Sequence, residues 1–204
     1  IVGTPYAFGG NRVTDTTAPT GSSATAYTAG TVATGVSINT QAFGTVTVNS
    51  GFSIDLNGVN MLGANQLSLT GSGSLSSGVI KNTSTNSATY AGLVVVTNTS
   101  TMSTSFGNIT FSGGLNTSSK TLTIDGASNT YITGPITGSS GGRIQKTGNG
   151  TLTLSGTNSA PYTLKVVAGN VVVTNPDALS TVGTSSILDS GASASDTGTL
   201  ILTG

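Results

Sequence analysis

Short apolar stretches separated by turn-forming residues are the feature that most restricts how this 204-residue chain can fold. From about residue 36 onward, Val, Ile and Leu alternate with Thr or Ser in stretches such as TVTV, TLTI and TLTL. A period of two residues is typical of a β-strand with one buried face. The intervening residues are mostly Gly, Asn, Asp and Ser, which favour turns. This pattern predicts an all-β chain.

Residues 1–35 differ in composition from the rest of the chain. They contain mostly small and polar residues, with few apolar stretches of strand length. Such a composition is typical of linkers and arms, not of packed cores. We therefore expect a polar, low-complexity N-terminal arm or cap over residues 1–35 and a β-domain over residues 36–204.

Two all-β architectures fit the pattern best. Large aromatic residues normally fill the core of a β-sandwich, yet aromatic residues make up only 5% of this chain and Trp is absent. In a β-solenoid each turn contributes only a few inward Val, Ile or Leu side chains, and short strands stack on one another. We expect a parallel β-solenoid (β-helix), with a β-sandwich as the alternative.

The low charge of the chain excludes several classes of partner. Charged residues make up 6% of the sequence and the formal net charge is zero, so we expect no nucleic-acid binding, which needs clustered Lys and Arg. No apolar run reaches the roughly 20 residues of a transmembrane helix. Since Cys is absent, disulfide bonds do not stabilise this fold.

Catalytic chemistry has few candidate residues. The chain lacks His and Cys, and its six acidic residues are isolated Asp side chains. Asp55 and Asp125 are the best candidates for a catalytic pair of a polysaccharide-acting enzyme, but we expect no enzyme, no metal site and no cofactor.

Thr-x-Thr stretches begin at Thr45, Thr121 and Thr151, and these irregular intervals argue against a threonine ladder that binds ice.

The stretch 144–175, IQKTGNGTLTLSGTNSAPYTLKVVAGNVVVTN, carries a more specific motif. A Lys precedes Gly-x-Gly-Thr-Leu-Thr-Leu-Ser-Gly, and an Asn and Tyr loop, a Gly and a Val-rich strand follow. It resembles the passenger-associated repeat of bacterial autotransporters. We assign one repeat to residues 143–175 and a partial copy, TGTLILTG, to residues 197–204. The matching positions are Lys146, Gly148, Gly150, Thr151, Leu152, Thr153, Leu154, Ser155, Gly156, Asn158, Tyr162, Gly169 and Val171 to Val173.

Alternation within GTLTLSG makes a residue-level prediction. Leu152 and Leu154 should face the core, Thr151, Thr153 and Ser155 should face outward, and glycines should turn the chain at each end.

The resemblance implies a right-handed parallel β-helix in a secreted protein at the outer surface of a bacterium. We expect a non-catalytic structural protein that self-assembles as a fibre or sheath subunit, with itself as partner. The first alternative is an adhesin-like passenger segment that displays loops to surface glycans or host surfaces. The second alternative is a polysaccharide-acting β-helix enzyme.

Overall fold

The computed structural model describes residues 44–62, 65–179, 188–189 and 197–203. The expected arm, residues 1–35, lies outside the described residues. Two short 3-10 turns, η1 (Ser74–Ser76) and η2 (Pro176–Leu179), are the helical elements of the described part. The strands are β1 (Thr45–Val48), β2 (Ile54–Asp55), β3 (Gln66–Gly71), β4 (Ile80–Asn82), β5 (Ala88–Tyr90), β6 (Val94–Thr104), β7 (Ile109–Phe111), β8 (Leu115–Asn116), β9 (Thr121–Gly126), β10 (Thr130–Ile132), β11 (Ile136–Thr137), β12 (Gly142–Lys146), β13 (Thr151–Leu154), β14 (Tyr162–Val166), β15 (Asn170–Val173), β16 (Leu188–Asp189) and β17 (Thr199–Leu202).

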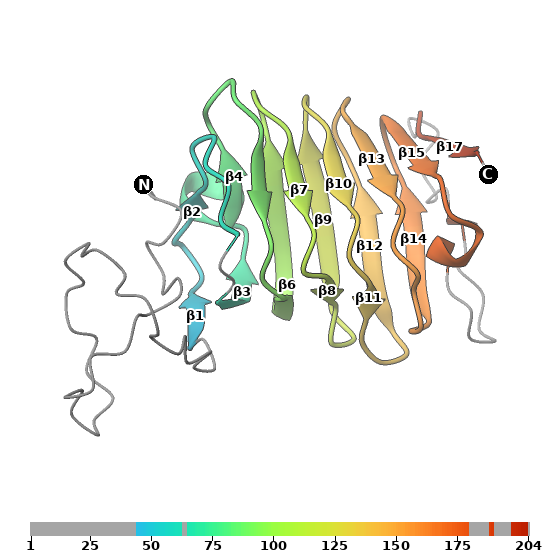
Figure 1. Ribbon diagram of the computed structural model, residues 1–204, viewed down its shortest axis with the longest axis horizontal. Coiled ribbons are helices and arrows are strands. Elements are labelled where there is room, and N and C mark those ends of the chain that lie inside the picture. Colours follow the sequence, from blue (N-terminus) through green and yellow to red (C-terminus); the bar gives the residue numbers. More distant parts are fainter. Residues whose placement is uncertain (1–43, 63–64, 180–187, 190–196, 204) are drawn as a thin grey trace, which may run out of the picture.

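The strands form a parallel β-solenoid, as the sequence predicts, and not a sandwich. One sheet has eleven strands: seven follow the order β1-β3-β6-β9-β12-β14-β16, and β2, β4, β8 and β11 pair beside this path. The other sheet has six strands in the order β17-β15-β13-β10-β7-β5. The first four strands belong to the eleven-stranded sheet, and from β5 onward the chain passes repeatedly between the two sheets. Neighbouring strands within each sheet run parallel. Figure 1 shows the strands side by side along the long axis, from β1 at one end to β17 at the other.

We call one circuit of the chain through both sheets a rung, and residues at the same register position on successive rungs a column. Inward columns form the core, because stacked apolar side chains exclude water along the whole length. In the six-stranded sheet one such column contains Tyr90, Phe111, Ile132, Leu154 and Val173, all at most 4% exposed. In the eleven-stranded sheet another contains Ile80, Met102, Ile124, Lys146 and Val166.

The strand GTLTLSG has the predicted orientation. Leu152 and Leu154 are 0% and 1% exposed, while Thr151 and Thr153 are half-buried on the outer side. A Cβ atom at Gly156 would lie 2.2 Å from the Gly134 carbonyl oxygen of the preceding rung, so only glycine fits this turn.

The partial copy lies directly above the full copy. β17 pairs with β15, and β15 pairs with β13, so Thr199 occupies the same column as Thr151, and Leu200 the same column as Leu152. The recurrence in the sequence therefore corresponds to two equivalent strands, two rungs apart in one sheet.

Candidate functional site

The outer side of the six-stranded sheet is the first candidate site. Its central column carries no charged residue, and each neighbouring pair of residues is in parallel register. We call this column the uncharged face, and it consists of Thr89, Thr110, Tyr131, Thr153, Val172 and Ile201. Neighbouring rungs are about 4.8 Å apart and alternate residues along one strand about 6.6 Å apart. Four consecutive members of this face, Thr89, Thr110, Tyr131 and Thr153, therefore carry hydroxyl groups on successive rungs, and Val172 and Ile201 are apolar.

Polar residues beside the uncharged face bind the backbone of adjacent rungs. The Asn108 Oδ1 atom accepts a hydrogen bond from the Asn129 amide at 3.0 Å, and the Asn129 Oδ1 atom accepts one from the Thr151 amide at 3.0 Å. At the other strand end, the Thr203 hydroxyl donates to the Val173 carbonyl oxygen at 3.3 Å. These groups stabilise the stack. The central column is the part of this sheet surface that a partner can contact.

Tyr131 is the aromatic residue of the uncharged face. It lies on β10 between Thr110 and Thr153 and is half-buried. An aromatic ring among hydroxyls combines an apolar surface with hydrogen-bonding groups. This arrangement can contact a neutral, hydroxyl-rich ligand.

The Thr-x-Thr stretches do not form one array. Those at Thr45 and Thr121 lie on β1 and β9 of the eleven-stranded sheet, whereas the one at Thr151 lies on β13 of the six-stranded sheet. Only Thr153 of the uncharged face belongs to one of these stretches, and its other hydroxyls come from Thr89, Thr110 and Tyr131. Their stacking depends on rung register, which the sequence does not reveal.

The structure does not bring Asp55 and Asp125 together. They occupy one outer column with Lys81 and Ser103 between them, so three strand spacings, about 14 Å, separate them. Paired carboxylates of glycosidases lie within about 5 to 9.5 Å of each other. This separation is too large for both carboxylates to act on one glycosidic bond.

Each of these carboxylates has a structural partner on the next rung. The Asp55 carboxylate accepts hydrogen bonds from the Thr83 amide at 3.1 Å and from the Thr83 hydroxyl. The Asp125 carboxylate accepts one from the Thr147 hydroxyl at 3.0 Å. Both Asp residues therefore link rungs at the turns where the chain leaves the eleven-stranded sheet.

Lys146 has a structural role that the motif alone did not reveal. Its side chain is 1% exposed and lies in an inward column between Ile124 and Val166. The Nζ atom donates hydrogen bonds to the Thr147 and Gly148 carbonyl oxygens, the latter at 2.8 Å. Burial lowers the pKa of Lys146, and the negative charge of Asp125 partly opposes that change. The lysine therefore satisfies the carbonyl groups of the TGNG turn from inside.

Asn158 and Tyr162, two other positions of the motif, contact each other in the core. The Asn158 Oδ1 atom accepts a hydrogen bond from the Ile136 amide at 2.6 Å, and its Nδ2 atom donates to the Tyr162 hydroxyl at 3.4 Å. The Tyr162 hydroxyl donates to the Ala178 carbonyl oxygen at 2.6 Å. Burial raises the pKa of Tyr162. Both residues fix the loop before β14.

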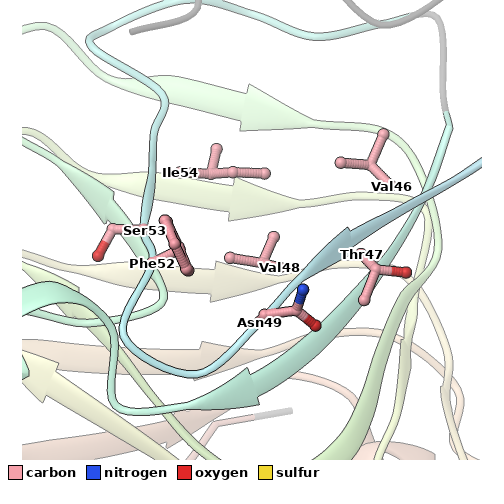
Figure 2. A pocket seen from close by; sticks show the side chains of 7 residues that line it. All are labelled: Val46, Thr47, Val48, Asn49, Phe52, Ser53 and Ile54. Carbon is pink, nitrogen blue, oxygen red and sulfur yellow. The ribbon is translucent and has the colours of Figure 1, made fainter.

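An open depression of about 320 Å³ lies beside the first strands. Figure 2 shows Val48, Phe52 and Ile54 around it, and Val46, Thr47, Asn49 and Ser53 complete its lining. The Phe52 side chain is 69% exposed. The lining offers apolar contact without a charged group.

Within the described ranges, no three His, Cys, Asp or Glu side chains gather where they could hold a metal ion. The helical turns of the described residues are too short to cross a membrane.

Scans of protein-family models, curated proteins and solved structures find no match to this chain. The resemblance to autotransporter passenger repeats thus stays a prediction from residues 144–175.

Proposed function

We propose that this chain is a non-catalytic structural module of a bacterial protein that is secreted or displayed on the outer cell surface. It acts as a subunit of a fibre or sheath, and it extends when a rung of a second copy stacks on β17. The observation that carries this proposal is the parallel, in-register stacking of strands in the six-stranded sheet, a pattern that a rung of a second copy can continue.

Leu202 continues an inward column but lacks the burial of the other members. It is 66% exposed, whereas Val173 and Leu154, the preceding residues of the same column, are 4% and 1% exposed. Burial of a leucine side chain stabilises by about 1.5 to 3 kcal/mol. A further rung over β17 gains this energy at a position already in register with the core.

The backbone of β17 favours the same contact. Among the described strands β17 pairs only with β15 and ends the six-stranded sheet. A free strand edge exposes unpaired N–H and C=O groups, which readily bind another strand. Parallel stacking of copies uses opposite ends of each molecule, and such head-to-tail contacts generate open filaments.

The opposite end of the stack is uncharged and partly apolar, which suits contact with β17 of another copy. Among the described strands, β1 lies at that end of the eleven-stranded sheet, and the uncharged depression with the exposed Phe52 ring lies beside it. Ile201, which is 38% exposed on β17, adds an apolar group at the other end. Neither set of residues contains a charge that would oppose contact between copies.

Sedimentation velocity of the chain over a range of concentrations tests the proposal. We expect the sedimentation coefficient to increase with concentration and Leu202→Lys to suppress that increase, because the lysine puts a charge into the joint. Thr174→Lys is the matched control, since it adds the same charge to an exposed position after β15 and leaves assembly unchanged. A wild-type chain that stays monomeric at every concentration contradicts the proposal.

Tyr131 favours a second candidate function, which is glycan binding by an adhesin-like passenger segment. Its ring lies in the uncharged face between two threonine hydroxyls, and an uncharged face suits neutral sugars. Binding of the monomeric chain to immobilised neutral glycans tests this function. We expect Tyr131→Ala to abolish binding and Val172→Ala, on the same face, to weaken it much less; equal binding by both variants contradicts it.

A further inference from the structure

We propose that Asn57 is a deamidation site and that the buried side chain of Asn82 holds the reaction back in the folded protein. This inference concerns the turn after β2 and is independent of the proposed function. It starts from two Asn-Gly pairs in the described part of the chain, Asn57-Gly58 and Asn149-Gly150. Glycine offers no side chain that obstructs attack by its own amide nitrogen, so Asn-Gly is the pair most prone to this chemistry.

The reaction needs a free glycine amide. The Gly58 nitrogen attacks the side-chain carbonyl carbon of Asn57, a C–N bond forms, and the bond from that carbon to Nδ2 breaks. Ammonia leaves with the proton that the amide loses. Water then opens the five-membered succinimide to aspartate or isoaspartate.

Two features of Asn57 favour this reaction and one contact opposes it. Its side chain is exposed to water, and it occupies the first central position of a tight turn closed by a 2.9 Å hydrogen bond from the Val59 amide to the Leu56 carbonyl oxygen. Asn57 and Gly58 have φ angles of 47° and 74°, as in the type I′ turn that favours Asn-Gly. The opposing contact involves the Gly58 amide.

Asn82 binds that amide from the next rung. The Gly58 amide donates to the Asn82 Oδ1 atom at 2.9 Å. The Asn82 side chain is 0% exposed, and its Nδ2 atom donates to the Asn86 and Asn108 carbonyl oxygens at 2.8 and 3.2 Å. Because Asn82 is fixed at both ends of its amide group, it holds the Gly58 N–H in a hydrogen bond that the reaction must break.

The second Asn-Gly pair provides an internal control. The Gly150 amide donates to the Gly126 carbonyl oxygen at 3.0 Å, so a main-chain acceptor protects Asn149. Removal of the Asn82 side chain therefore frees Gly58 and leaves Gly150 bound. Deamidation at Asn57 would add a carboxylate two residues from Asp55, in a chain with few charges.

Peptide mapping by mass spectrometry after incubation at mildly alkaline pH tests the proposal. In folded Asn82→Ala we expect Asn57 to deamidate roughly tenfold faster than in the wild type, the factor that corresponds to one hydrogen bond. The rate at Asn149 should not change. A folded variant, checked by circular dichroism, with an unchanged rate at Asn57 overturns the proposal.

A second measurement needs no variant. The wild-type chain is incubated folded and in urea, and the rate at Asn57 is compared between the two. We expect at least a tenfold slower reaction in the folded chain. Equal rates in the two conditions show that the fold gives Asn57 no protection, and they overturn the proposal as well.

Discussion

The ammonium group of Lys146 lies 2.8 Å from the carbonyl oxygen of Gly148, two residues further along the chain. The contact closes the TGNG turn from the inside of the solenoid. A lysine in an apolar column is tolerated because its stem packs between Ile124 and Val166 and its charged end finds two carbonyl partners.

Replacement of this lysine should destabilise the fold. Lys146→Ala removes a buried stem and leaves two carbonyl groups without their donor, so we expect the free energy of unfolding to fall by about 2 to 4 kcal/mol. Lys146→Met, which keeps the stem, should cost less. Lys165→Ala is the control on the next rung, where the side chain is half-buried on the outer side, and it should change stability by about 0.5 kcal/mol or less. Urea unfolding measures all three, and equal losses at both lysines would refute the role of Lys146.

Stability should fall above about pH 10, the pKa of tyrosine in the unfolded chain. Burial raises the pKa of both Tyr90 and Tyr162. Their stabilising contribution is complete below the unfolded pKa and is lost as pH rises toward the folded value, because only the unfolded chain then ionises. The lowered pKa of Lys146 makes stability rise with pH instead. Two tyrosines contribute to the loss and one lysine to the gain, so we expect a net loss.

Urea midpoints at pH 8 and pH 11 measure this effect. Tyr162→Phe should have a smaller loss between the two pH values than the wild type, since one of the two ionising groups is gone. A midpoint that is constant or higher at pH 11 would contradict the assignment of buried tyrosines.

Leu75 offers a stabilising substitution. It has a φ angle of 50° and is 99% exposed. Its left-handed backbone conformation therefore destabilises the chain, and no burial of the side chain offsets this. Asn adopts this conformation more readily than Leu. We expect Leu75→Asn to stabilise the chain by about 0.5 to 1 kcal/mol.

Leu62 is the matched control for this substitution. It is 67% exposed, and its φ angle is not positive. Leu62→Asn should therefore leave the thermal unfolding midpoint nearly unchanged. An equal rise in both variants would assign the gain to lost apolar exposure and not to backbone strain.

Local pattern together with the low aromatic content predicted the solenoid. The alternation in TLTL correctly predicted which face of β13 is buried, because side chains in a strand alternate whatever the strand pairs with. The same alternation places Lys146 on the side of Ile144 and Asn82 on the side of Ile80, so the sequence held the signal that both polar residues point inward.

Relations between rungs could not be predicted in the same way. Which strands stack, and in which register, depends on turn lengths and on packing between residues far apart in the sequence. The separation of Asp55 from Asp125 and the column that joins Thr110 to Thr153 both depend on that register. The exposure of Leu202 likewise becomes visible only when its column is known.

Parallel stacking of β5 on β7 in register underlies the core and the uncharged face. Paired cysteines test it directly, because the chain has no cysteine of its own. Thr89 and Thr110 are register partners, at about 4.8 Å, within the Cα separation that a disulfide allows. We predict that Thr89→Cys with Thr110→Cys forms an intramolecular disulfide on mild oxidation. Thr89→Cys with Thr153→Cys, three rungs apart at about 14 Å, should not; equal yields from the two pairs, or bridging only of the distant pair, would contradict the solenoid.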